Sequence, residues 1–315
     1  MNLQQMRYVL EISKQKLSIS DAAEALFTSQ PGVSKQLRLL EEELGIEIFV
    51  RHGKRLTAIT EPGRQVMAIA ERMLREADNL RQVGQDFQNE DSGRLVIATT
   101  HTQARYALPK VVGEFMRRYP KVQLHIHQGN PRQMCEQVLA GEADLAIATE
   151  AAADLPELIL LPCKQWNRSV IARKGHPILR EAPLTLEAIS RFPIITYDSA
   201  FAGRSLTNKA FLARGLKPNV VLTAIDSDVI KTYVNMDLGI GIIASMAFDP
   251  LVDRELGALD ASHLFESSTT RIGLPKNTWL RGYAYAFIEM FAPQLTRHVV
   301  DAALAGTKRD SDPGL

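Results

Sequence analysis

The sequence has few cysteines, no long apolar run and almost no net charge, and each absence excludes a class of protein. Its two cysteines, Cys135 and Cys163, are far apart and in no metal-ligand spacing, so neither a disulfide framework nor a zinc site is expected. No stretch of about 18 apolar residues occurs, which argues against a membrane-spanning helix. The N-terminus lacks the apolar segment of a signal peptide, so we expect a cytoplasmic location.

The balance of charge leaves the choice of partner to local patches. The 315 residues include 37 basic and 36 acidic side chains, so overall charge neither favours nor disfavours nucleic acid. The length suits two or three domains, and 45% hydrophobic residues can bury a core. No G-x-G-x-x-G, P-loop or nucleophile-elbow pattern is present. An enzyme, a cofactor and a metal site are therefore not predicted, although His125 and His127 on one strand face leave a metal pair as a minor alternative.

Residues 1–60 have the pattern of a winged helix-turn-helix. Ser18 is a candidate N-cap for a short second helix rich in small residues. After a tight turn, Thr28 or Ser29 can cap a third helix that ends at Gly45. The buried stripe of this third helix would comprise Val33, Leu37, Leu40 and Leu44.

The outward face of the third helix carries side chains that can donate hydrogen bonds to base edges and phosphates. Residues 48–50 and 55–57 then predict a hairpin with three cations near its tip, which suits a phosphate or minor-groove clamp. The acidic run 41–43 would face solvent or a partner subunit. An ordinary solvated helix is the alternative. The candidate DNA-binding residues are Thr28, Ser29, Gln30, Pro31, Ser34, Lys35, Arg38, Arg51, Lys54 and Arg55.

A single long helix is predicted from residue 61 to about residue 88. Its apolar residues recur every seven positions, as in a short coiled coil; they are Val66, Met73, Leu80 and Phe87. Such a stripe needs a partner, which is either the chain's own N-terminal domain or a second copy. The polar segment 89–93 predicts a hinge into the next domain.

Strands alternate with helices after residue 93, which indicates an α/β architecture. Ligands of such folds bind beyond the carboxyl ends of strands, where helix N-termini present free N–H groups. Residues 99–103 crowd hydroxyls and an amide at one such junction. Thr100 alone could simply cap a helix, but the group together could bind an anion without any charged side chain. Similar junctions follow at Thr149 and at residues 201–205.

One long stretch and several shorter segments resemble a known family. TSQPGVSKQLRLLEEELGIEIFVRHGKRLTAITEPG is similar to the DNA-binding domain of LysR-type transcriptional regulators. TTHTQARYALP, Thr149, CKQWNRS, DSDVIKTYV and GIGIIASMA resemble the CysB- and Cbl-like subgroup, which controls cysteine biosynthesis and sulfur or sulfonate assimilation. The similarity runs from Met1 to about Pro293.

The resemblance implies an α/β fold class with a winged helix-turn-helix, a linker helix and a two-lobed Rossmann-like effector domain of periplasmic-binding-protein type 2. It implies a homodimer through the linker helix, a homotetramer, and double-stranded promoter DNA as partner, with RNA polymerase a further partner to consider. The expected domains are 1–60 for DNA binding, 61–92 for the linker and hinge, and 93–315 for the effector, with lobe I at about 93–162 and 267–295 and lobe II at about 163–266.

The resemblance also implies an anionic effector such as sulfate, thiosulfate or an acetylserine. Its expected contacts are Thr100, Thr102, Gln103, Thr149, Trp166 and Ala202. Ala202 stands where the subgroup usually has threonine, so one hydrogen bond worth about 0.5–1.5 kcal/mol is lost and the preferred ligand can differ. Arg204 could supply charge there or form a surface ion pair. The alternative functions are a regulator of sulfonate use with another effector and, less favoured, a solute-binding protein.

Overall fold

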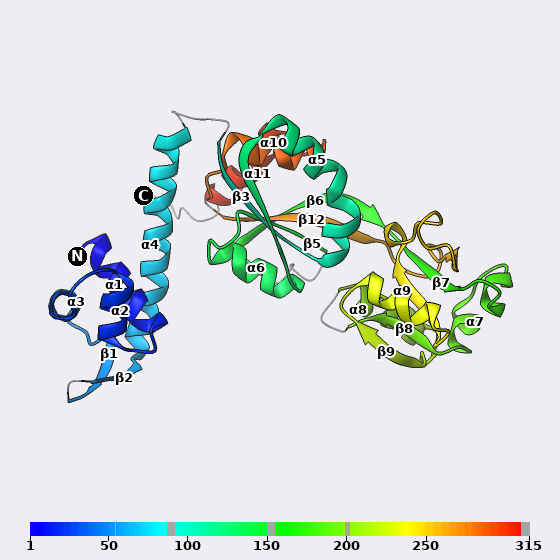
Figure 1. The fold of residues 1–315 in the computed structure, drawn as a ribbon, viewed down its shortest axis with the longest axis horizontal. Coiled ribbons are helices and arrows are strands. Elements are labelled where there is room, and N and C mark those ends of the chain that lie inside the picture. Colours follow the sequence, from blue (N-terminus) through cyan, green and yellow to red (C-terminus); the bar gives the residue numbers. More distant parts are fainter. Residues whose placement is uncertain (54, 87–91, 150–154, 199–201, 277, 310–315) are drawn as a thin grey trace. The chain divides into compact units, whose positions relative to one another are not determined.

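The computed structural model describes residues 1–53, 55–86, 92–149, 155–198, 202–276 and 278–309 (Figure 1). The chain forms two compact units, Met1–Asn89 and Glu90–Leu315. Among the described residues, no helix combines the length and the apolar character that crossing a membrane requires.

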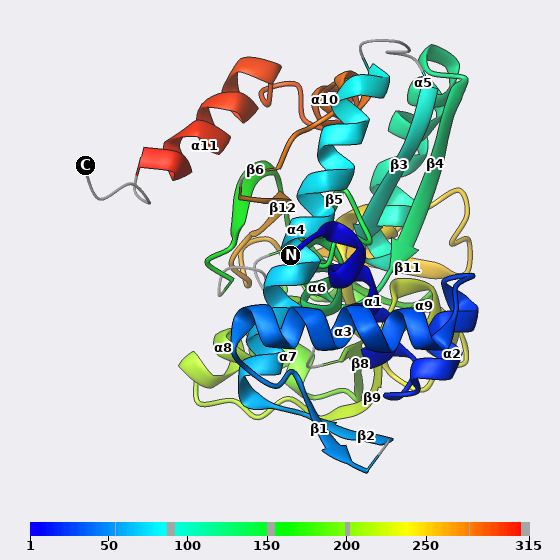
Figure 2. The ribbon, with the colours of Figure 1, turned by 90° about the vertical axis from the view of Figure 1, so that its left-hand side faces the viewer.

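The N-terminal unit contains helices and one antiparallel hairpin. Its elements are α1 (Leu3–Lys14), α2 (Ile19–Ala25), α3 (Gln30–Leu44), β1 (Phe49–His52), β2 (Arg55–Ile59) and α4 (Glu61–Asp86). Figure 2 shows α3 along its length, with the β1–β2 hairpin beneath it. Apolar side chains of the first three helices, the hairpin and α4 share one core.

The predicted helix ends are confirmed. The Ser18 hydroxyl accepts a hydrogen bond from the Asp21 amide at 3.2 Å, and Ser29, not Thr28, caps α3 by accepting from the Gly32 amide at 3.3 Å. Gly45 ends α3 in the left-handed conformation, with a φ of 66°, which glycine adopts without a Cβ penalty.

Two predictions for the end of α3 are wrong. Leu44 is 38% exposed, so the buried stripe ends one turn earlier, at Leu40. Glu41 does not face solvent: it is buried, and its carboxylate accepts a hydrogen bond from the Ile48 amide at 2.9 Å. The chain turns back after Gly45 and covers Glu41 with the first residues of the hairpin.

The predicted apolar stripe of the long helix α4 is partly buried in the N-terminal unit and partly exposed. One side packs against α1, with Met67 and Ala70 buried and Val66 and Met73 half-buried in the shared core. Ile69 and Leu80 are 47% and 76% exposed. Phe87 lies outside the described residues. The chain's own domain therefore covers only part of the stripe.

The C-terminal unit contains two five-stranded sheets, which define lobe I and lobe II. The strand order in lobe I is β4 (Lys121–Gln128), β3 (Ser92–Thr99), β5 (Leu145–Ala148), β12 (Ser268–Pro275) and β6 (Leu158–Trp166). In lobe II it is β11 (Leu256–Asp260), β7 (Arg168–Arg173), β10 (Ile240–Ala244), β8 (Ile194–Tyr197) and β9 (Val220–Ala224). The chain passes between the lobes twice, from β6 to β7 and from β11 to β12.

Helices cover both faces of the lobe I sheet (Figure 1). Alternate residues of β3 point to opposite faces: Leu95 packs beneath α5 (Leu108–Arg118) and α10 (Gly282–Phe291), whereas Val96 packs on α6 (Pro131–Leu139). The C-terminal helix α11 (Arg297–Arg309) joins the first of these layers. This double cover explains why β3 and β5 are continuous apolar runs.

Lobe II repeats this arrangement with α7 (Leu186–Ser190), α8 (Ala202–Ala213) and α9 (Ser227–Asn235). Two short 3-10 turns, η3 (Pro177–Arg180) and η4 (Ser245–Ala247), complete it. Strand β4 lies at the edge of the lobe I sheet, and five of its eight side chains are exposed.

Both cysteines are free thiols, and Cys163 is the one to test. Burial raises the pKa of Cys163 from 9.0 to about 11, so at about pH 8 only about one molecule in 1000 carries a thiolate. We expect iodoacetamide to modify Cys163 about 100-fold more slowly than a thiol of pKa 9.0, measured by peptide mass spectrometry. Met116→Cys, at an exposed position of α5, supplies the reference thiol in the same chain. Equal rates at the two positions would contradict the burial of Cys163.

Candidate functional site

The exposed face of α3 presents the residues predicted to contact DNA. Gln30, Lys35 and Arg38 are exposed, and Ser34 is half-buried. The Gln30 side-chain amide donates to the Ser34 hydroxyl at 3.3 Å, and Arg38 forms an ion pair with Glu42 at 3.1 Å. Both partners of that pair are largely exposed, so it is worth about 0–1 kcal/mol and can yield to a phosphate. Three further predicted residues lie exposed at the start of α3: Thr28, Ser29 and Pro31.

The hairpin does not present three equivalent cations. Arg51 pairs with the buried Glu41 carboxylate at 2.6 Å, which ties the hairpin to α3 and neutralises much of the arginine's charge. Arg55 is exposed at the start of β2, and Lys54 lies outside the described residues. Sequence reasoning missed the role of Arg51 because Glu41 was expected to face solvent.

The hydroxyls at the end of β3 are mostly bonded within lobe I. Thr99 donates to the Ile147 carbonyl at 3.0 Å, and Thr100 accepts from the Gln103 amide at 3.4 Å. The Gln103 side-chain amide donates to the Thr270 hydroxyl at 2.9 Å. Thr100 therefore does contact the helix start, as the capping interpretation allowed, and Gln103 is anchored to strand β12.

The turn after Thr102 is a π-helix, η1 (Gln103–Ala107), which leads into α5. Such wide turns are rare and concentrate at functional sites. The sequence predicted an ordinary helix here. The widened turn directs Gln103 into lobe I, whereas Arg105 and Tyr106 reach residues of lobe II.

The other predicted effector contacts come from three strand or helix ends. Thr149 is buried directly after β5, which runs parallel to β3, so both predicted threonines follow carboxyl ends of adjacent strands. Trp166 ends β6, and its indole Nε1 is buried without a hydrogen-bond partner among the described residues. Ala202 is the first residue of α8, and its side chain, like that of Arg204, lies outside the part that the structure describes.

Tyr197 is a residue at this junction that sequence reasoning missed. Its hydroxyl lies 2.6 Å from the Ser227 hydroxyl, accepts from the Ala244 amide at 3.0 Å, and hydrogen-bonds with Thr102 of lobe I. Burial raises the pKa of Tyr197, so the phenol stays neutral. Tyr197 ends strand β8, and the rule that singled out Thr100 and Thr149 could have found it too.

Arg168 is a second missed residue, and it corrects the expectation of a site without charge. Its guanidinium is almost fully buried, donates to the Glu266 carbonyl at 2.8 Å and to the Ser268 hydroxyl at 2.9 Å, and lies 5.4 Å from the Trp166 ring centre. A buried positive charge therefore lies beside the predicted Trp166 contact.

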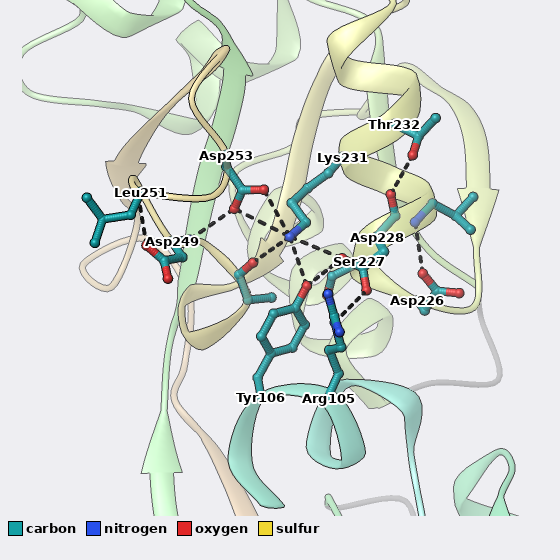
Figure 3. Close-up of polar contacts among 12 residues, drawn as sticks. Arg105, Tyr106, Asp226, Ser227, Asp228, Lys231, Thr232, Asp249, Leu251 and Asp253 are labelled. Carbon is teal, nitrogen blue, oxygen red and sulfur yellow. Dashed lines mark hydrogen bonds and ion pairs between the residues drawn. The ribbon is translucent and has the colours of Figure 1, made fainter. Parts of the chain in front are cut away.

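A polar network joins η1 of lobe I to α9 of lobe II (Figure 3). Tyr106 donates to the Asp228 carboxylate at 2.6 Å and accepts from the Lys231 ammonium at 2.8 Å. Lys231 also pairs with Asp228 and with Asp253, each at 3.1 Å.

Charge pairing dominates this network. Burial by itself lowers the pKa of Lys231, but hydrogen bonds to Tyr106, Asp253 and Asp228 outweigh it and raise the pKa above its ordinary value. Burial likewise raises the pKa of Asp228, but bonds from Tyr106 and Lys231 hold that pKa below its usual range. Near neutral pH the network thus contains a charged ammonium at Lys231 and an ionised carboxylate at Asp228.

Two family models together match most of this chain. The one described as "Bacterial regulatory helix-turn-helix protein, lysR family" matches residues 3–64, and the one described as "LysR substrate binding domain" matches residues 88–296. The chain belongs to the LysR family.

Individual LysR-family relatives are similar over nearly their whole length. The HTH-type transcriptional regulator SsuR of Burkholderia cenocepacia is 53% identical over 311 residues, which cover 99% of this chain and 100% of the relative. The regulator CysB of the same organism is 51% identical, over 97% and 98% of the two chains. The crystal structure of the cofactor-binding domain of the Cbl transcriptional regulator is 39% identical, with a TM-score of 0.65, over 72% of this chain and 96% of that one.

These relatives confirm the resemblance seen in the sequence, to the family and to its CysB- and Cbl-like subgroup. LysR-family members are transcriptional regulators that bind DNA and small effectors and that oligomerise. The fold class is confirmed with them: an N-terminal helix-turn-helix and a two-sheet α/β domain.

A separate hollow of about 450 Å³ lies on lobe II of this LysR-family chain, between α7, α8 and the segment after β11. Its charged groups are already paired, Lys209 with Glu266 at 2.6 Å and Arg214 with Glu187 at 3.9 Å. Of the predicted effector contacts whose side chains the structure describes, none lines it. The polar strand ends, not this hollow, are the candidate effector site.

Proposed function

We propose that the chain is a LysR-type regulator of sulfur-assimilation and cysteine-biosynthesis genes that responds to a small anionic sulfur-pathway effector. The observation that carries this proposal is the meeting of hydroxyl groups from both lobes: Thr102, three residues after the end of β3, and Tyr197, at the end of β8. The buried Arg168 adds positive charge nearby. Hydroxyls and amides with one buried cation suit an anion that must bind reversibly.

In this proposal residues 1–60 bind promoter DNA. The α3 face around Gln30, Ser34, Lys35 and Arg38 enters the major groove, because its donors are exposed and its other side is buried in the domain. Arg55 contacts phosphate, and Lys54 is proposed to do so from the sequence. Arg51 serves mainly to hold the hairpin against α3 through Glu41.

Residues 93–315 bind the effector, and residues 61–92 connect the two functions. Thr100, Thr102, Gln103 and Thr149 supply hydrogen bonds from lobe I, Trp166 lines the site, and Ala202 is the proposed contact from lobe II. The α4 helix pairs two chains through its exposed apolar surface, which includes Ile69 and Leu80. A tetramer formed by two such dimers, and a contact with RNA polymerase, belong to the same proposal.

Ala202 supports a second candidate, a regulator of sulfonate use. Alanine at the first position of α8 offers no hydroxyl to a tetrahedral anion and leaves more room than threonine would. A sulfonate carries the same anionic oxygens plus an organic group that needs that room. A thermal-shift comparison of the full chain with sulfate, thiosulfate, acetylserine and short alkanesulfonates separates the two candidates.

Thr100→Val tests the effector site. The variant keeps the shape of the side chain but removes its hydroxyl, so we expect sulfate to bind about tenfold more weakly, as calorimetry on the full chain would measure. Promoter binding in a gel shift should be unchanged in the absence of effector.

Thr99→Val is the matched control for this variant. Its hydroxyl is equally buried but bonds to the Ile147 carbonyl inside the sheet, so its loss should lower thermal stability and leave sulfate affinity alone. Sulfate binding that is normal in Thr100→Val would place the effector elsewhere.

A further inference from the structure

The relative orientation of the two lobes depends on non-covalent contacts between them as well as on the two chain segments that connect them. The chain passes between the sheets only from β6 to β7 and from β11 to β12, among the described residues. Two crossing segments act as a hinge unless contacts elsewhere restrain them. The polar network of Figure 3 lies at η1 and α9, away in sequence from both crossings, and it bonds one lobe to the other.

We propose that Tyr106, Asp228 and Lys231 form an inter-lobe latch that positions the Thr100–Gln103 turn against lobe II and thereby sets the affinity for the anionic effector. The proposal rests on the function proposed above and names the residues that prepare its site. They are positioning residues, because they act through the turn and not by touching the effector.

The central bond of the latch has the geometry of a strong one. The Tyr106 hydroxyl lies between an ammonium at 2.8 Å and a carboxylate at 2.6 Å, so it both accepts from and donates to a charged group. The Lys231 nitrogen also lies 5.1 Å from the centre of the Tyr106 ring. No other residue type provides a ring and a neutral hydroxyl at this reach.

Lobe II holds its side of the latch rigidly. Lys231 is only 7% exposed and donates to the Ala247 carbonyl at 3.1 Å besides its two carboxylate partners. Asp253 in turn accepts from the Asp249 amide at 3.0 Å. A buried ammonium that is fully bonded in this way cannot follow Tyr106 if the lobes separate, so separation breaks charged hydrogen bonds.

Weaker contacts surround the same carboxylate. Arg105 lies 3.6 Å and His101 3.9 Å from Asp228, and both side chains are partly exposed. These distances exceed a hydrogen bond, so neither contact fixes the geometry of the carboxylate. The cations of Arg105 and Lys231 beside Asp228 leave little reason for a metal ion to bind it.

The latch acts on the predicted effector contacts through a short piece of chain. Tyr106 follows Gln103 by three residues within η1, and Gln103 is bonded to Thr270 of lobe I. Thr102 is bonded to Tyr197 of lobe II. The turn is thus held on one side by lobe I and on the other by lobe II. If loss of the latch leaves about one molecule in ten in the binding arrangement, the apparent Kd rises about tenfold.

Tyr106→Phe tests the proposal because it removes the bridging hydroxyl and keeps the ring. In the full chain we expect sulfate to bind about fivefold to twentyfold more weakly by calorimetry, with sodium chloride used to match ionic strength. The control is Tyr285→Phe, which removes the hydroxyl that a buried tyrosine donates to Asp301, inside lobe I. This control should lose stability and keep its sulfate affinity.

A distance measurement reports on the latch without any ligand. Spin labels at Glu142→Cys of lobe I and Lys217→Cys of lobe II, both exposed positions, would be placed in a Cys163→Ser background and diluted with unlabelled chain. We expect a narrow distance distribution in the parent and in Tyr285→Phe, and a broad one in Tyr106→Phe that sulfate narrows.

The outcomes separate the latch from the proposed function. Unchanged distances in Tyr106→Phe would overturn the latch, and broadened distances with unchanged sulfate affinity would overturn its role in positioning the turn. If the parent chain binds no sulfate, the effector class is wrong, but a broadened distribution in Tyr106→Phe would still support the latch and an unchanged one would still refute it.

Discussion

A chain that carries Ser34→Ala together with Arg38→Ala is expected to bind promoter DNA at least about 30-fold more weakly than the parent. The two residues are four apart on α3 and share its outward face, where each contact to a base edge or phosphate is worth about 1–3 kcal/mol. Gel shifts on promoter fragments of sulfur genes, repeated at several salt concentrations, would measure the loss. The dependence of log K on log salt should also become shallower by about one unit if Arg38 contacts a phosphate.

Two controls keep this result interpretable. Lys14→Ala removes an exposed cation at the end of α1 and should change DNA affinity little. Thermal unfolding of the double variant should match that of the parent, because the Arg38–Glu42 pair is exposed and contributes little stability. Promoter affinity that survives the double substitution would show that α3 is not the recognition helix.

The second large effect is expected in the assembly of the protein. Ile69→Glu with Leu80→Glu should break the pairing through α4 and lower the mass of the assembly, because a carboxylate buried at a helix–helix interface costs several kcal/mol. The two residues are eleven positions apart, close to three helical turns, so they lie on one face of α4. They are exposed within a single chain, so the substitutions should not disturb its own core. Light scattering at several concentrations would measure the mass.

Ala68→Glu is the matched control for this pair. Ala68 is an exposed residue of the same helix, rotated by about 100° from Ile69, so a carboxylate there should leave the mass unchanged. A double variant that keeps the parent's mass would show that the exposed stripe of α4 does not pair two chains. Met73 is a poorer choice for this test, since it is half-buried against its own domain.

The helix ends of the N-terminal unit could be predicted from the sequence because they depend on adjacent residues. Ser18, Ser29 and Gly45 each hydrogen-bond to a backbone group three or four residues away, so the local sequence is enough to predict these caps. Glu41 could not be placed in the same way. Its burial depends on a hairpin that follows it and folds back over it, and nothing in the spacing of the acidic run reports that contact.

The candidate effector site shows the same division. The carboxyl-end rule found Thr100 and Thr149 because each directly follows an apolar strand, and the same rule would have found Tyr197. Arg168 and the Tyr106–Asp228–Lys231 group lack such a signal. Arg168 is bonded to residues about 100 positions away, and Tyr106 to residues more than 120 positions away. Only the closed topology of the two lobes brings these groups together.

The order of strands in lobe I has a consequence for synthesis on the ribosome. Strand β12 lies between β5 and β6 in the sheet, yet it follows every strand of lobe II in the chain. A nascent chain that has emerged only as far as β11 can complete the lobe II sheet, but β5 and β6 then lack the strand that joins them. Lobe II can therefore fold while the lobe I sheet still lacks β12, which leaves the apolar edges of β5 and β6 unpaired. A ribosome stalled before Ser268 would hold a chain whose first-made lobe is the unfinished one, and such a chain would need protection from aggregation.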